Sequence, residues 1–156
     1  MPNGQGEKST MAGIVELYNE VVKGNKEIRI EGDLDLMNTD VTVLPDNLKV
    51  GGSLYLGNTR VTALPDNLKV GGFLYLSNTR VTALPDNLEV GEGLYLSGTG
   101  VTTLPDNLKV GGDLFLKNTG VTALPDNLKV GGNVVGLEEN RKRLRKTAVP
   151  TVHPAP

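Results

Sequence analysis

The pentapeptide Leu-Pro-Asp-Asn-Leu recurs along this chain at a constant interval of 20 residues. It begins at five positions, which are Leu44, Leu64, Leu84, Leu104 and Leu124. Residues 51–70 and 71–90 differ at three places only, namely Ser53/Phe73, Gly57/Ser77 and Lys69/Glu89. A period of this length without a slip is typical of a repeat protein, in which each unit buries its apolar side chains by stacking on its neighbours.

Each unit has the features of one layer of such a stack. In the segment 74–76, Leu-Tyr-Leu alternates inward and outward as a short strand does. Pro85 fixes φ at the following corner and cannot donate to a ladder. The side chains expected to point inward are Leu74, Leu76, Val81, Leu84, Leu88 and Val90. The pattern predicts an α+β repeat solenoid with one short parallel β-sheet, built over residues 31–136 from five repeats and a truncated sixth.

The two ends of the array differ from the repeats. Residues 1–9 are polar and are expected to be flexible, and residues 10–30 are expected to form an N-terminal cap of one amphipathic helix and a strand. Residues 137–147 predict a basic C-terminal helix, with acidic residues at its start and basic residues at its end, an order that suits the helix dipole. Residues 148–156 are Pro-rich and are expected to be disordered.

The repeat resembles the short, 20-residue leucine-rich repeat of bacteria. The LPDNL segment and the Leu-x-Leu strand carry this resemblance over about residues 31–135. Two positions depart from the family pattern: Gly71 replaces its Leu before the strand, and Thr79 replaces its ladder Asn, with Asn78 one place earlier. Either Thr or Asn therefore forms the inner ladder. Similar arrays occur in secreted bacterial effectors and in phage proteins, so the resemblance implies a protein-binding module that acts on a host protein as an inhibitor or effector.

The composition excludes several kinds of chemistry. The chain has no Cys, and its one His, His153, lies in the Pro-rich tail. No nucleophile or phosphate-loop motif is present, and the Asp that recurs after each Pro is expected to cap a turn rather than to bind calcium. We therefore expect a non-enzymatic protein without metal or cofactor. No segment reaches the roughly 18 apolar residues of a membrane span, and the polar N-terminus favours a cytoplasmic protein, or one delivered into a host cell without a cleaved signal.

One outward column collects most of the aromatic residues. The strand-centre positions are Tyr55, Tyr75, Tyr95 and Phe115. We expect them to form a binding face for another protein, with Phe73 as an added anchor and with Arg60 and Arg80 as a charged flank. The alternative is that the rings only stabilise the stack through cross-strand contacts.

Two further interactions are predicted near the C-terminus. Arg141, Lys142, Arg143, Arg145 and Lys146 form a basic run. Such a run favours a solvated helix, or else contact with nucleic acid or with an acidic protein surface. The strand near 133–135 ends the array, so it leaves an open edge through which the chain could self-associate.

Overall fold

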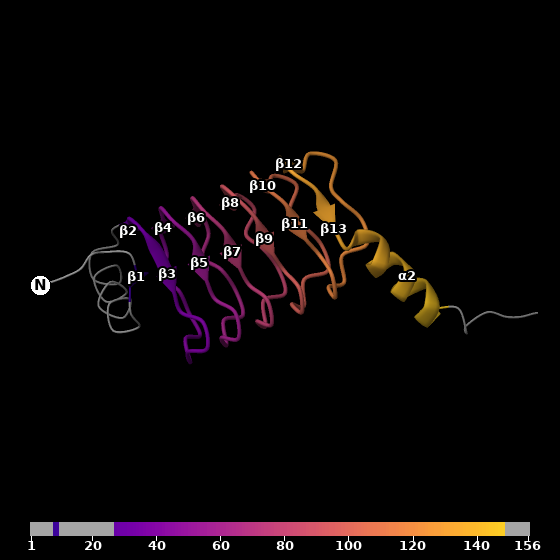
Figure 1. The fold of residues 1–156 in the computed structure, drawn as a ribbon, viewed down its shortest axis with the longest axis horizontal. Helices are drawn as coiled ribbons and strands as arrows, with labels where there is room; N and C mark the ends of the chain where they lie inside the picture. Colours follow the sequence, from indigo (N-terminus) through magenta and orange to yellow (C-terminus); the bar gives the residue numbers. More distant parts are fainter. Residues whose placement is uncertain (1–7, 10–26, 149–156) are drawn as a thin grey trace, which may run out of the picture.

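The computed structural model describes residues 8–9 and 27–148, with side chains described for residues 27–144. These residues form a parallel β-solenoid in which one layer follows another along a single axis (Figure 1). The repeat solenoid predicted from the period is confirmed. The predicted helix of the N-terminal cap and the tail beyond residue 148 lie outside the described residues.

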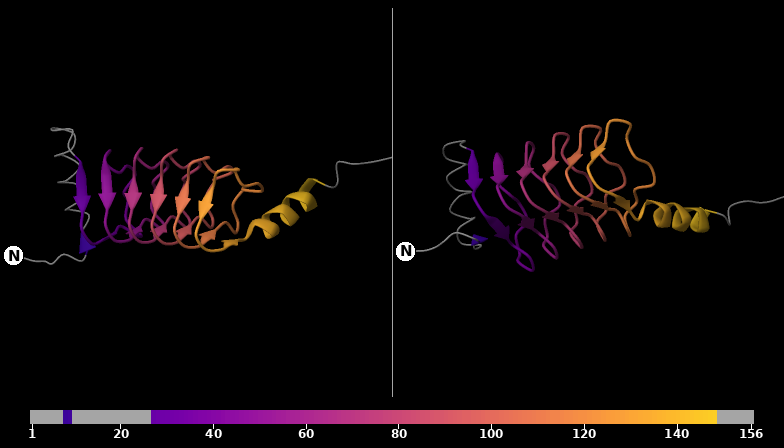
Figure 2. Two further views of the ribbon diagram at one scale, coloured as in Figure 1. Left: turned by 90° about the horizontal axis from the view of Figure 1, so that it is seen from above. Right: turned by 45° about the horizontal axis from the view of Figure 1, so that its top comes forward.

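Two parallel sheets run along the solenoid, and successive strands alternate between them (Figure 2). Sheet A consists of β1 (Lys8–Ser9), β3 (Asp33–Asp35), β5 (Leu54–Tyr55), β7 (Leu74–Tyr75), β9 (Leu94–Tyr95), β11 (Leu114–Phe115) and β13 (Val134–Val135). Sheet B consists of β2 (Ile28–Ile30), β4 (Leu48–Val50), β6 (Lys69–Val70), β8 (Glu89–Val90), β10 (Lys109–Val110) and β12 (Lys129–Val130). Within the repeats, each residue pairs with the residue 20 positions later, as Tyr55 does with Tyr75.

Sheet B corrects the prediction of a single sheet. From β4 onward, its strands begin within one residue of the Pro-Asp-Asn corner and end at the glycine of the next bend, so only two or three residues are extended in each layer. In β4, Leu48 and Val50 are buried while Lys49 between them is half-buried. This alternation is that of a strand, but it is too short to stand out in the sequence beside two turn signals. The strand of the N-terminal cap is present as β2. The structure also gives Lys8 and Ser9, which were assigned to the flexible N-terminus, a strand beside β3.

The core is a continuous column of leucine and valine between the two sheets. All six inward positions predicted for the unit are buried, and Leu74, Leu76, Val81 and Leu88 are fully inaccessible. At the C-terminal end, burial falls: Leu124, Leu128 and Val130 are only partly buried. The apolar residues of one layer are thus covered chiefly by the next layer, as expected for a one-dimensional stack.

The turn after each sheet A strand uses both Asn and Thr. Asn38, Asn58, Asn78 and Asn118 adopt a left-handed conformation, and Gly98 takes this place in the fourth unit with φ 77°. The next residue is a threonine whose hydroxyl donates back to the strand, as Thr79 Oγ1 does to Leu76 O at 2.8 Å. Asn58 Nδ2 also donates to Asn38 Oδ1 of the layer before, at 3.0 Å. Threonine therefore closes the turn within each layer, and an asparagine contact joins two layers.

The Gly-Gly bend between the two sheets is required by close packing. A Cβ on Gly71 would lie 2.2 Å from the main-chain oxygen of Gly51 in the preceding layer. The amide of Gly71 meanwhile donates to Val50 O at 2.8 Å. Glycine at this corner lets the backbones of consecutive layers approach to hydrogen-bonding distance.

Candidate functional site

The outward face of sheet A carries a ladder of four aromatic rings. It consists of Tyr55, Tyr75, Tyr95 and Phe115, each half-buried and each paired in register with the next. The ring centroids are 6.4 Å apart for Tyr55 and Tyr75, 5.2 Å for Tyr75 and Tyr95, and 4.4 Å for Tyr95 and Phe115. The predicted stack of rings is therefore present as a continuous set of contacts.

The geometry of the ladder changes along the axis. The planes of Tyr75 and Tyr95 are tilted by 51°, whereas those of Tyr95 and Phe115 lie within 12° of parallel. The faces of the last two rings are directed at one another, so they stabilise the stack as cross-strand neighbours do. The geometry therefore supports the alternative interpretation, in which the rings stabilise the stack. A partner that approached this end of the ladder would meet mainly the edges of the rings.

Phe73 widens the ladder in the third unit. It is 38% exposed, and its ring centroid lies 6.1 Å from that of Tyr95. Its ring also lies against Gly93 of the next layer, since a Cβ on Gly93 would come within 3.0 Å of Phe73 Cδ1. Phe73 is therefore the most exposed member of the aromatic surface, and the small residue beside it makes room for its ring.

The column that contains Phe73 has a structural role that the sequence did not reveal. Asp33 Oδ1 accepts the amide of Ser53 at 2.8 Å, and Ser53 Oγ accepts the amide of Phe73 at 2.9 Å. In the fifth unit, Asp113 Oδ1 accepts the amide of Asn133 at 2.8 Å. The residue changes in this column thus partly reflect side chains that link one layer to the next.

The two arginines of the predicted flank stand apart from the rings. Arg60 and Arg80 are exposed and follow the turn at the end of the sheet A strands. Their amides donate to Val41 O and Val61 O of the preceding layers. Among the residues that the structure describes, neither side chain makes an ion pair or a cation–π contact. Both guanidinium groups are available to a partner, but not as part of the aromatic cluster.

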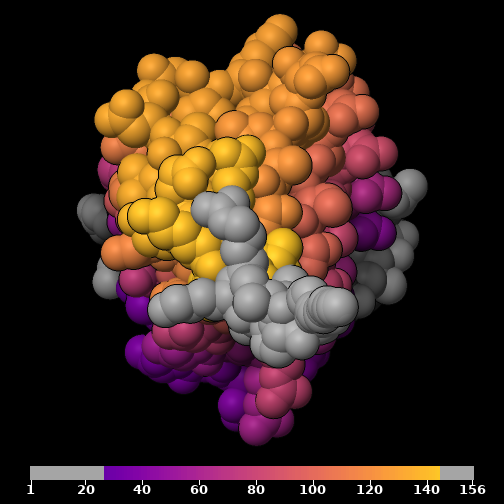
Figure 3. Space-filling model, turned by 90° about the vertical axis from the view of Figure 1, so that its right-hand side faces the viewer, coloured from indigo at the N-terminus to yellow at the C-terminus, as the bar shows by residue number. Residues whose placement is uncertain are grey.

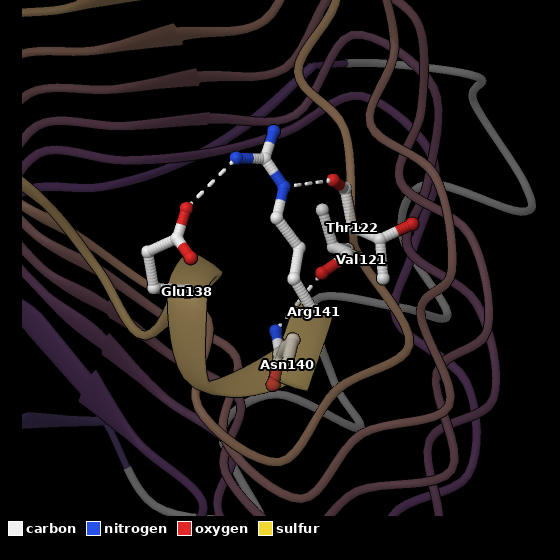
Figure 4. Close-up of polar contacts among 5 residues, drawn as sticks. All are labelled: Val121, Thr122, Glu138, Asn140 and Arg141. Atoms are coloured by element: carbon white, nitrogen blue, oxygen red, sulfur yellow. Dashed lines mark hydrogen bonds and ion pairs between the residues drawn. The ribbon is translucent and has the colours of Figure 1, made fainter. Parts of the chain in front are cut away.

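The basic C-terminal segment forms helix α2 (Leu137–Ala148), as predicted, and its first turns bind the last layer. Asn140 is 1% exposed, and its Nδ2 donates to Leu116 O at 2.7 Å, to Val121 O at 3.0 Å and to Thr119 Oγ1 at 3.2 Å. Arg141 Nε donates to Thr122 O at 2.7 Å (Figure 4). The carbonyls at this corner of the last layer are thus capped by a buried amide and by a guanidinium.

The basic run is therefore divided between two roles. Arg141 also pairs with Glu138 at 3.0 Å, and Arg143 donates to Thr119 O. Lys142, by contrast, is exposed. The capping role of Asn140 was not predicted, and Arg141 and Arg143 were expected to be solvated or to contact a partner. A signal for Asn140 was present in the sequence, because an Asn one turn into a helix that directly follows a repeat array can satisfy the carbonyls of the last turn.

Helix α2 leaves part of the C-terminal end open. Figure 3 looks onto this end and shows α2 in yellow over one part of it, with the orange surface of the last unit extending beyond. The apolar residues near this opening are the partly buried Leu124, Leu128 and Val130. Among the described residues, sheet A ends at β13 and sheet B ends at β12, so the predicted open edge at β13 is accompanied by a second one at β12.

Sheet B presents a second outward column, which is mostly basic. It consists of Arg29, Lys49, Lys69, Glu89, Lys109 and Lys129. Glu89 Oε2 lies 3.0 Å from Lys69 Nζ and 4.0 Å from Lys109 Nζ. The hydrogen bond from Lys69 lowers the pKa of Glu89, helped by the charges of both lysines and opposed by partial desolvation. An open groove of about 750 Å³ runs beside this column over the glycines of the Gly-Gly bends.

Two kinds of site find no support in the described residues. Within residues 8–9 and 27–148, no three His, Asp or Glu side chains come together as metal ligands would. The Asp residues after each Pro, among them Asp66 and Asp86, are exposed at the corners. In the same part of the chain, no helix has the length and hydrophobicity needed to cross a bilayer.

Comparison with known proteins does not assign the chain to a family. No protein-family model matches the sequence, and no curated protein shows significant similarity to it.

Proposed function

We propose that this chain is a non-enzymatic module that binds another protein through the outward face of sheet A. The observation that carries the proposal is the aromatic surface formed by the ladder and Phe73, in which Phe73 is 38% exposed. Large aromatic side chains supply contact area at a low cost in conformational entropy and are enriched among the residues that dominate binding energies. The resemblance to bacterial and phage repeat arrays suggests a role as an inhibitor or effector.

The aromatic surface is better suited to a protein than to a small ligand. It follows consecutive parallel strands about 4.8 Å apart, so it extends along the axis of the solenoid over several layers. Small-molecule sites are usually concave pockets that enclose their ligand. Arg60 and Arg80, on the far side of the turn, add charges that a larger partner can reach and that would act mainly on the rate of association.

The alternative function, nucleic-acid binding through the basic C-terminal segment, has fewer free charges than the sequence implied. Arg141 and Arg143 hydrogen-bond to carbonyls of the last layer. Phosphate binding would then depend on Lys142, Arg145 and Lys146, and it would weaken steeply with salt.

The test compares three variants in capture experiments from the source cell, with partners identified by mass spectrometry. Replacing both Phe73 and Tyr75 by Ala should weaken capture by about thirtyfold or more, because truncating a central anchor typically costs about 2 kcal/mol. Ser97→Lys is a second variant that tests the same face without removing a ring. The fold should tolerate it, because Lys117 already occupies this column in the fifth unit, but it places a charge beside the rings. It should also weaken capture.

The third variant replaces Lys142, Arg145 and Lys146 by Gln and leaves the capping residues in place. We expect it to retain the partner. If this variant loses the partner while the aromatic variants keep it, the basic segment is the binding site and the proposal for sheet A is wrong.

A further inference from the structure

The column of sheet A that begins with Asp33 forms a ladder of side-chain to main-chain hydrogen bonds, and this ladder has a gap. In three layers, an oxygen of Asp33, Ser53 or Asp113 accepts the amide of the residue 20 positions later. Phe73 and Gly93 occupy the two layers between, and neither has a side-chain oxygen. Within the described residues, the amides of Gly93 and Asp113 accordingly have no hydrogen-bond acceptor.

The gap lies within the aromatic surface. A Cβ on Gly93 would meet Phe73 Cδ1 at 3.0 Å and Tyr95 Cε1 at 3.2 Å. Gly93 itself is buried, whereas Asp113 is half-buried. The ring of Phe73 therefore covers Gly93, and Asp113 is the more exposed of the two residues. An amide without a protein acceptor can exchange water for an oxygen of a partner, and the exchange gives the net value of one hydrogen bond.

We propose that the amide of Asp113, beside the rings of Phe73 and Tyr95, is a hydrogen-bonding point for a main-chain carbonyl of the partner protein. This inference rests on the function proposed above and adds the chemical group that the surface recognises. The other layers show that an oxygen fits this place, because Asp33 and Ser53 each supply one. A neutral oxygen suits the gap better than a carboxylate, because the carboxylate of Asp113, which accepts the amide of Asn133 on the other side of its strand, would repel a second negative charge nearby.

The wild-type protein offers a first test by amide hydrogen exchange. The amide of Asp113 should exchange faster than those of Ser53, Phe73 and Asn133, which have side-chain acceptors. Equal protection of all four amides would contradict the gap. Ser53→Gly is a matched control, because it removes the acceptor of the Phe73 amide and should give that amide the fast exchange expected for Asp113.

Binding is tested by following the amide signals in a titration with N-acetylphenylalanine N-methylamide, a neutral peptide fragment that carries an aromatic ring. The Asp113 amide should shift and saturate, and acetate should produce a weaker response. Gly93→Ser supplies an oxygen within the protein, whereas Gly93→Ala adds the same Cβ without the oxygen. The affinity for the fragment should be about fivefold weaker in the Ser variant than in the Ala variant. A fivefold change is about 1 kcal/mol, the net value of a typical hydrogen bond.

The possible failures can be told apart. If the tyrosine signals respond to the fragment and the Asp113 amide does not, the carbonyl site is wrong and the aromatic surface remains. An equal response of the Gly93→Ser and Gly93→Ala proteins would also overturn the carbonyl site. Loss of capture in the aromatic variants tests the proposed function independently of both results.

Discussion

The side-chain amide of Asn140 lies 3.2 Å from Thr119 Oγ1 and closes the last turn of the solenoid. The same Nδ2 reaches two main-chain oxygens, those of Leu116 and Val121. In an inner unit, the equivalent valine carbonyl accepts an amide of the next layer, as Val101 O does from Gly120 N. Asn140 thus supplies to Val121 O the bond that a further layer would make. This relationship makes α2 a structural cap as well as a carrier of positive charge.

Replacing Asn140 by Ala should therefore destabilise the protein by about 1–3 kcal/mol, because it leaves the carbonyl of the buried Val121 without its hydrogen-bond donor. Asn140→Asp is nearly isosteric but cannot donate, so it should be at least as damaging at neutral pH. Chemical unfolding measures both effects. A stability equal to that of the wild-type protein in both variants would show that water or another side chain caps these carbonyls.

Replacing Leu76 by Ala should destabilise by about 2–5 kcal/mol, because Leu76 is fully buried and the layers on either side cannot close the cavity without breaking register. Thermal unfolding measures the loss. Thr82, in the same unit but exposed, is the control, and Thr82→Ala should change stability by no more than about 0.5 kcal/mol. Similar melting curves for the two variants would contradict the assignment of the inward face.

The Gly-Gly bend predicts a sharp difference between two glycines. Gly71→Ala should cost about 1–3 kcal/mol or more, since its Cβ would lie 2.2 Å from the oxygen of Gly51 and one backbone would have to move. At Gly100 the nearest atom to a new Cβ is the methyl carbon of Thr82, at 3.1 Å, and this side chain can shift. Gly100→Ala should thus be close to neutral in the same unfolding assay.

Glu89 relieves repulsion in the basic column of sheet B. Glu89→Lys would place like charges at Lys69, residue 89 and Lys109 in adjacent strands, and it should destabilise by about 0.2–1 kcal/mol, the range for exposed cross-strand pairs. Added salt should reduce the loss. An effect that is independent of salt would mean that packing, rather than charge, is disturbed.

The pH dependence of the Glu89 contribution follows from the direction of its pKa. Because folding lowers this pKa below 4.5, the carboxylate contributes its full stabilisation above that value and loses it as the pH falls through the lowered pKa. The wild-type protein and Glu89→Gln should therefore differ in stability at pH 7 and converge in acid. Unfolding curves at the two pH values measure this difference.

The repeat and its inward residues were predictable because a strict period repeats the same evidence five times. Leu76 and Val81 are buried as the alternation required. Sheet B was not predicted, because a strand such as Lys69–Val70 is two residues long and lies between a Pro-Asp-Asn turn and a glycine bend. At that length, periodicity does not distinguish a strand from the continuation of a loop.

The sequence was sufficient to predict which residues of the candidate site face outward in a row, but not which contacts they make. The outward position of Tyr75 follows from its place between two inward leucines, but the tilt and spacing of the rings depend on neighbours such as Gly57, whose Cβ would lie 3.2 Å from Tyr75 Cδ2. The link from Ser53 Oγ to the amide of Phe73 joins residues 20 positions apart, so it emerges only when the layers are stacked. The capping role of Asn140 depends likewise on where α2 docks.

The way α2 is attached has a consequence for how such a chain can change in length. The cap contacts Leu116, Thr119, Val121 and Thr122, all of them in the last complete unit. The preceding unit has the same four residue types at Leu96, Thr99, Val101 and Thr102. The cap can therefore dock on any unit that has these four residues. A gene that gained or lost one 60-nucleotide segment, the coding length of a 20-residue unit, would still encode a solenoid whose last layer is capped. The aromatic surface would change by the rings of that unit, which are two in residues 71–90 and one in each of the units 51–70, 91–110 and 111–130.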